Sequence, residues 1–265
     1  LKRLVIALES TSFYGIHIAD YLSTCLQLAP FHTAVYCLNP KTVANYKKSF
    51  VDLGKNDYID AFVIADFARV GRITIEPWRG SQFLALQRLT RHRLHLVQTL
   101  TREKTYMLSN IFLKFSEFSL LDEDEQPFSN NYGATASAVL TEFLSVEEII
   151  EKPMDELINF ICEKGHNRFP NPEKTAQLLQ AAARNSYRLD KCLYEPLTIS
   201  IASSFTLIST YYAEIKKVNQ AIEKTIKGLD PTAYQSLLSI PGVGPVMAAG
   251  ILAEIGTIDA FKDND

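Results

Sequence analysis

The sequence lacks the features that mark several classes of protein. Its cysteines are few and widely separated, and none forms a C-x-x-C pair of the kind found in zinc or redox sites: Cys25, Cys37, Cys162 and Cys192. This spacing also argues against the disulfide framework of a small secreted domain. No apolar run reaches the roughly 18 residues that cross a bilayer, and no signal peptide is apparent. These absences predict a cytoplasmic protein that is neither exported nor embedded in a membrane.

A strong net charge is also missing. The formal charge is -3, with 22% charged and 47% hydrophobic residues, which is the balance of an ordinary soluble globular protein. Any contact with nucleic acid must therefore come from local basic patches rather than from the field of the whole molecule. The chain starts at Leu1 rather than at a methionine, and it ends in the polar segment 259–265. We expect it to be incomplete at both ends.

The first 75 or so residues alternate strand and helix signals, which indicates an α/β fold. The pattern predicts, in order, a strand ending at Glu9, a helix at about 14–24, a strand at 34–38 and a helix at about 57–70. Ser10 and Thr11 are the expected N-caps of the first helix. The dipeptide Asn39-Pro40 ends the second strand and opens a short segment that finishes at Lys47-Lys48.

The rest of the chain is predicted to be mainly helical. Residues 81–118 contain no Gly or Pro and repeat leucine at a spacing of three to four, so we expect a long helix of the coiled-coil type. Arg93, Glu103 and Asn110 interrupt its apolar seam. The other expected features are an acidic patch at 122–125, a turn at 133–135, helices around 139–143, 154–162 and 173–193, and a long helix from 196 to 227.

Three carboxylates form a candidate metal site. Asp57 and Asp60 are three residues apart on the predicted helix and therefore share one face of it. Glu9 comes from the carboxyl end of a strand, which is where α/β sheets place their ligands. Hard oxygen ligands of this kind suit Mg²⁺ or Mn²⁺. The helix macrodipole also favours acids in a first turn, and that alone would explain the two aspartates.

A glycine pair near the end of the chain resembles a helix-hairpin-helix. Gly242 and Gly244 lie in the segment 239–252 between two apolar periodic stretches. In that motif, glycines allow a tight turn, and the amides of the following helix meet a phosphate oxygen without reading base sequence. An ordinary turn between two helices is the alternative interpretation.

Basic residues gather between positions 79 and 104, where six of them face a single acid, Glu103. Contact with a nucleic-acid backbone is the sharper hypothesis for Arg79, Arg88 and Arg91, and a solvated helix face is the simpler one. His92 and His95 are one turn apart, but no soft ligand accompanies them, so they are interpreted as surface or packing residues.

Together these residues resemble the DEDD insertion-sequence transposases. The resemblance is carried in the family's order by Glu9-Ser10-Thr11, Asn39-Pro40, Lys55-x-Asp57-x-x-Asp60-Ala61, Leu89-Thr90-Arg91 and the late Ile240-Pro241-Gly242-Val243-Gly244-Pro245. It spans nearly the whole chain. The implied fold is an incomplete α/β RuvC-like (ribonuclease-H-like) domain at 1–78, a long coiled-coil-type helix with a helical insert at 79–195, and the start of a C-terminal transposase domain with the helix-hairpin-helix-like motif at 196–265.

The resemblance also implies a site and a reaction. Glu9, Asp57 and Asp60 match three of the family's four catalytic, metal-binding acids. The first aspartate has no match, and the chain ends before the position of the family's nucleophilic serine. The implied activity is metal-dependent cleavage and exchange of DNA strands, guided by a noncoding RNA and carried out by a homo-oligomer, a dimer or a tetramer. A chain lacking those two residues is expected to be inactive alone.

Two other functions remain open on the sequence. The same acids would serve a RuvC-like junction nuclease that uses Mg²⁺ and a water nucleophile. Without catalysis, the helix-hairpin-helix and the long helix would form a nucleic-acid-binding scaffold whose binding depends on salt but not on magnesium.

Overall fold

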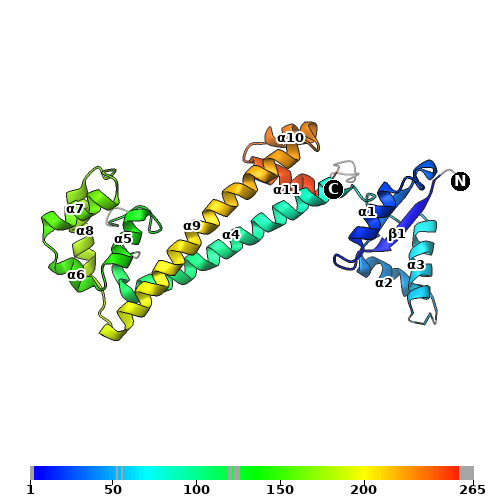
Figure 1. The fold of residues 1–265 in the computed structure, drawn as a ribbon. Coiled ribbons are helices and arrows are strands. Elements are labelled where there is room, and N and C mark those ends of the chain that lie inside the picture. The colour runs from blue at the N-terminus through cyan, green and yellow to red at the C-terminus, as the bar shows by residue number, and fades with distance from the viewer. Residues whose placement is uncertain (1–2, 52, 55, 119–120, 122–125, 257–265) are drawn as a thin grey trace. The chain divides into compact units, whose positions relative to one another are not determined.

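The computed structural model describes residues 3–51, 53–54, 56–118, 121 and 126–256 (Figure 1). The predicted acidic patch at 122–125, the terminal segment 259–265 and Lys55 lie outside these residues. The chain divides into two compact units. Unit 1 combines Leu1–His92 with Asn219–Asp265, and unit 2 is Arg93–Val218. All four cysteines are free thiols. Among the described residues, no helix combines the length and apolarity that a bilayer crossing needs.

Unit 1 begins with a parallel pair of strands. The strands are β1 (Val5–Glu9) and β2 (Ala34–Leu38), which confirms both predicted strands. Their register places Val5 opposite Ala34 and Glu9 opposite Leu38. Both strands therefore end at the same edge of the sheet. In the described part of the chain the sheet has these two strands, so this α/β region is small beside the helical remainder.

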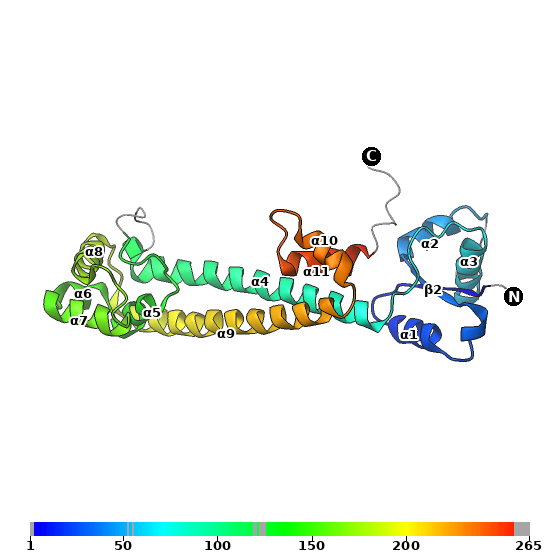
Figure 2. The same cartoon turned by 90° about the horizontal axis from the view of Figure 1, so that it is seen from above.

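Helices surround this pair of strands. They are α1 (Ile16–Thr24), α2 (Pro40–Lys47) and α3 (Asp57–Arg69). Both views show α1 on one side of the sheet and α3 on the other (Figures 1 and 2). The prediction of Ser10 or Thr11 as the N-cap of α1 is wrong, because Ser12 adopts a left-handed φ of 56° and the chain turns before the helix begins after Gly15.

A small apolar core holds α3 against the sheet. Its buried members come from β2, α2 and α3: Leu38, Val43, Val63 and Phe67. The ring of Tyr46 packs edge-on against Phe67, with centroids 5.1 Å apart. Because burial of apolar surface is the main driving force here, this core fixes how α3 presents its first turn.

The C-terminal part of unit 1 is a helical hairpin, α10 (Pro231–Leu238) and α11 (Pro245–Ile255). Gly242 has a φ of 87° in the connecting turn, a conformation that favours glycine. Gly244 has an extended conformation and serves as the N-cap of α11. Only the first glycine of the pair is therefore required by the backbone.

Unit 2 contains the adjoining portions of two long helices, α4 (Ser81–Lys114) and α9 (Tyr194–Lys227), which lie side by side there in both views (Figures 1 and 2). Shorter helices complete it: α5 (Ala134–Glu142), α6 (Val146–Glu151), α7 (Met154–Lys164) and α8 (Pro172–Asn185). Helix α6 was not predicted. The helix expected at 173–193 ends at Asn185, because the chain is extended at Ser186 before a 3-10 turn at Lys191–Leu193.

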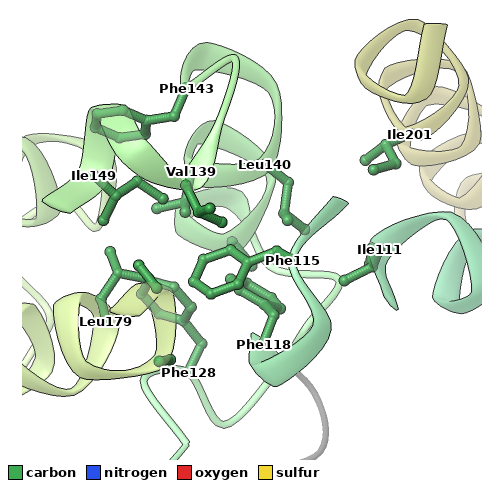
Figure 3. Packing of buried hydrophobic residues seen from close by; sticks show 14 of the residues in the cluster. Ile111, Phe115, Phe118, Phe128, Val139, Leu140, Phe143, Ile149, Leu179 and Ile201 are labelled. Atoms are coloured by element: carbon green, nitrogen blue, oxygen red, sulfur yellow. The ribbon is translucent and has the colours of Figure 1, made fainter. Parts of the chain in front are cut away.

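Aromatic residues form the centre of unit 2 (Figure 3). Phe115 and Phe118, just beyond α4, lie with ring centroids 5.2 Å apart, and Phe118 continues to Phe128 at 5.7 Å. Aliphatic side chains from α5, α6, α8 and α9 close around them, including Leu140, Ile149, Leu179 and Ile201. The short helices are therefore held to the ends of α4 and α9 by one shared core.

Polar pairs join α4 to α9 within unit 2. The hydroxyl of Ser204 donates to Glu103 at 2.6 Å, and Asn110 donates to the hydroxyl of Ser200 at 3.0 Å. Glu103 and Asn110 are two of the residues that interrupt the apolar seam. Since each has a partner on α9, the interruptions fix the register of the two helices rather than merely weakening their contact.

Lys114 is a buried cation at the end of α4. Only 3% of the residue is exposed. Its ammonium donates to the main-chain oxygens of Leu140 at 2.7 Å and Phe143 at 2.8 Å, and to the hydroxyl of Thr198. These carbonyls lie at the C-terminus of α5, where a helix favours a positive charge. Burial lowers the pKa of Lys114 to about 8.

We expect Lys114→Met to lower the free energy of unfolding at pH 7 by about 2 to 4 kcal/mol, because two buried carbonyls lose their donor. Urea denaturation followed by circular dichroism measures this. The folded-state pKa lies below the unfolded value of 10.5, so the wild type should gain stability relative to the variant as the pH rises from 8 to 10. A constant difference over that range would contradict the assignment.

Candidate active site

Glu9 stands at the carboxyl end of the parallel strands. It is the last residue of β1, and it is half-buried. The pairing continues beyond it, because the amide of Ser10 donates to the main-chain oxygen of Leu38 at 2.7 Å. The carboxylate is therefore carried by a backbone that is fixed on both sides of the residue.

Helix α2 brings two lysines back toward this edge. The side chain of Asn39 accepts from the amide of Lys41 at 2.9 Å and caps the helix, and Pro40 occupies its first position. The segment predicted only as short is therefore a full helix. Lys47 and Lys48 lie at its far end, where basic residues complement the helix dipole.

Helix α3 presents the two aspartates in its first turn. The side chain of Asn56 caps it by accepting from the amide of Ile59 at 2.8 Å. Asp57 is exposed and Asp60 is half-buried. The ammonium of Lys47 lies 2.6 Å from Oδ1 of Asp60.

One cavity unites Glu9, Asp60 and the two lysines. Its volume is about 550 Å³, and the rest of its lining includes Pro40, Val43, Phe50 and Leu53. Asp57 is not among the lining residues. Among the described residues, no three side chains of His, Cys, Asp or Glu are grouped so that they could hold a metal ion. The structure thus brings together two of the three predicted acids.

Asp66, about two turns after Asp60 on α3, makes hydrogen bonds outside this cavity. It accepts hydrogen bonds from the hydroxyl of Tyr46 at 2.7 Å and from Nε of Arg69 at 2.8 Å. These bonds lower the pKa of its carboxyl group. Asp66 therefore joins α2 to α3 and does not line the cavity at Glu9.

Glu9 also lines a second cavity, of about 280 Å³, on the side of α1 and α4. Arg88, Arg91 and Trp78 contribute to its wall. The guanidinium of Arg88 lies 4.8 Å from the ring centre of Phe13, and the side chain of Arg88 is exposed. Nε1 of Trp78 is buried, and no described residue forms a hydrogen bond with it. A predicted basic residue thus lines the same cavity as the strand-end glutamate.

The other two predicted arginines hold the C-terminal hairpin. Arg91 makes two hydrogen bonds of 2.8 Å to the carboxylate of Glu254, which lower the pKa of Glu254. Arg79 donates to the main-chain oxygens of Leu252 at 3.1 Å and Ala253 at 2.9 Å. These carbonyls are at the end of α11, so Arg79 completes the helix terminus.

Comparison with known families matches both ends of the chain. A transposase family model of the DEDD IS110 type matches residues 1–114, and a model described as the transposase IS116/IS110/IS902 family matches residues 228–265. Together they cover more than half of the chain. The chain belongs to the IS110 family of DEDD transposases. No curated protein and no solved structure matched it.

In this transposase the two matched regions contain the candidate site and its surroundings. The first contains the strand pair, the cavity at Glu9 and the arginines of α4, and the second contains the hairpin with Gly242 and Gly244. The contacts of Arg79 and Arg91 connect the two regions within unit 1.

Sequence reasoning gave no role to Lys47, Lys48 or Glu254. The Lys47-Lys48 pair was visible, but its partner Asp60 lies 13 residues away and is reached only through the packing of α2 on α3. Glu254 is 163 residues from Arg91, and no local pattern connects them.

The contact between Arg79 and α11 predicts an effect of Gly256→Ala. Gly256 has a φ of 82°, and a Cβ there would lie 2.7 Å from the guanidinium of Arg79. We expect a loss of about 1 to 3 kcal/mol in the free energy of unfolding. The emission of Trp78, the single tryptophan, measures it during urea denaturation.

Gly250→Ala in the same helix is the matched control. A Cβ at Gly250 would meet nothing within 4 Å, and the position is helical. This change should raise stability by up to about 1 kcal/mol. Equal effects of the two substitutions would contradict the role given to Gly256.

Proposed function

We propose that this transposase cuts and exchanges DNA strands with the help of Mg²⁺ or Mn²⁺ at the cavity lined by Glu9 and Asp60. The observation that carries the proposal is that Glu9, at the carboxyl edge of a parallel strand pair, lines one cavity together with Asp60 of α3. That edge is where α/β sheets bind their ligands. The sheet is interpreted as part of a RuvC-like domain.

The donor set suits a hard divalent cation. Glu9 and Asp60 offer carboxylate oxygens, and Asp60 already holds a positive charge at 2.6 Å in the form of Lys47. Asp57 is exposed one turn earlier on α3, within the same family motif. When bound, the metal would activate the attacking oxygen and neutralise the charge that develops on the phosphate.

DNA would approach along the second cavity. Arg88 is exposed there beside Glu9, and its guanidinium is suited to a phosphate oxygen. The turn at Gly242 and the start of α11, where the N-cap Gly244 has no side chain, provide main-chain amides of the kind that meet a backbone phosphate. Such contacts position DNA without selecting its sequence.

Three further parts of the proposal rest on the family resemblance. They are a guide noncoding RNA, the formation of a dimer or tetramer, and a strand-exchange outcome. The contacts between α4 and α9 use one side of each helix in unit 2 and leave large apolar residues exposed, among them Leu94, Phe112, Leu113 and Ile199. These exposed residues support association of subunits through the long helices.

Asp60→Asn and Glu9→Gln should each reduce movement of the insertion sequence by about 10²- to 10³-fold, because each removes a ligand charge from the metal. Transposition frequency in cells that express the protein from its own element measures this. Asp66→Asn is the control, since that carboxylate lies on the same helix outside the cavity. Full activity of either cavity variant would overturn the assignment.

The products separate the alternatives. Hydrolysed ends, without a covalent link between protein and DNA, would identify a junction nuclease in place of a recombinase. DNA binding that ignores magnesium and is unchanged in a Glu9, Asp57 and Asp60 triple variant, without any cleavage, would identify a scaffold.

Arg88→Gln should weaken DNA binding and reduce the slope of log affinity against log salt by about 1. Fluorescence anisotropy of a labelled duplex over a range of NaCl concentrations measures both quantities. Arg102→Gln removes the same charge from α4 without touching either cavity at Glu9. An equal effect of the two substitutions would show that only overall charge matters.

A further inference from the structure

Lys47 and Lys48 are adjacent in sequence and line the same cavity, yet their surroundings differ. The side chain of Lys47 is 22% exposed, and its ammonium lies 2.6 Å from Oδ1 of Asp60. Lys48 is exposed, and its ammonium lies 3.4 Å from the side-chain oxygen of Asn45 in its own helix. The cavity therefore contains one lysine that neutralises a candidate metal ligand and one that does not.

A divalent cation and the Lys47 ammonium compete for Asp60. At 2.6 Å the ammonium occupies one of the carboxylate oxygens and cancels its charge. A metal ion needs that charge, and two cations sharing one half-buried carboxylate repel each other strongly. When a metal ion binds Asp60, the Lys47 ammonium must therefore move away from the carboxylate, or the metal ion is bound more weakly.

We infer that Lys47 is an internal counter-ion that neutralises Asp60 in the metal-free protein and is displaced when a divalent cation binds. This inference rests on the proposed function, because it takes Asp60 as a metal ligand. Once displaced, the ammonium remains on the last turn of α2 in the same cavity, where it attracts an anionic phosphate. Lys47 is thus a positioning residue that couples metal binding to the arrival of DNA.

The test is the affinity of the 265-residue chain for Mn²⁺ alone, with free Mn²⁺ measured by electron paramagnetic resonance. Lys47→Gln removes the competitor, so we expect about 5- to 50-fold tighter binding. Lys48→Gln removes the same charge from the same cavity and should change the affinity by less than about threefold. Lys47→Arg keeps the competing charge and should leave the affinity close to that of the wild type.

A measurement on the unmodified protein supplements the variants. Displacement exposes the Lys47 amine, so its acylation by a water-soluble ester, measured by mass spectrometry, should increase several-fold on addition of Mn²⁺. Lys48 acts as the internal control and should react equally with and without the metal. This arm does not depend on whether a substituted protein folds.

The outcomes distinguish the inference from the proposed function. If the wild type binds Mn²⁺, Asp60→Asn abolishes binding, and Lys47→Gln matches Lys48→Gln or binds more weakly, the counter-ion role is overturned and the metal site stands. If neither the wild type nor Lys47→Gln binds Mn²⁺, both are overturned. Tighter binding by Lys47→Gln together with metal-dependent acylation of Lys47 supports the inference.

Discussion

The parallel pairing of β1 with β2 is the constraint on which the candidate site depends. Parallel strands end at one edge, so the register that sets Glu9 opposite Leu38 also sets where the chain leaves β2. Asn39 and Pro40 start α2 directly after that point, and the helix returns its last turn to the cavity. The apolar core around Val63 then holds α3 against the same strands. Glu9, Lys47 and Asp60 meet as a consequence of these short connections.

Electrostatic balance follows from this geometry. Two carboxylates and two ammonium groups line the cavity at Glu9, so their formal charges cancel. Unpaired carboxylates in a half-buried site would be unstable in the charged form, because removal from water raises the free energy of an ion. Lys47 relieves this for Asp60, and the cavity remains open. Under the proposed function, the Lys47 ammonium would balance the charge of Asp60 until a metal ion takes its place.

Local sequence patterns predicted the strands and helices of this site better than they predicted the contacts between them. The strands at Glu9 and at residues 34–38, and the helix beginning at Asp57, depend on apolar runs and caps that lie within a few residues of each other. The prediction of the N-cap of α1 was wrong because no local sequence pattern indicates the left-handed conformation of Ser12. The neighbours of Asp60 could not be predicted either, since the Lys47 contact requires two helices to pack in one orientation.

The arginines of α4 show how one basic run can serve two purposes. Arg88 and Arg91 are three residues apart and lie on neighbouring parts of the helix surface. Within the described part of the chain, Arg91 is paired with an acid, Glu254, and Arg88 is not. The bidentate geometry and the fixed partner make Arg91 a connector between the two family regions within unit 1. Arg88, stacked on Phe13, keeps its hydrogen-bond donors near the cavity at Glu9. Charge in this segment thus attaches the hairpin through Arg91 and leaves the guanidinium of Arg88 exposed at the second cavity. The difference between the two arginines depends on Glu254.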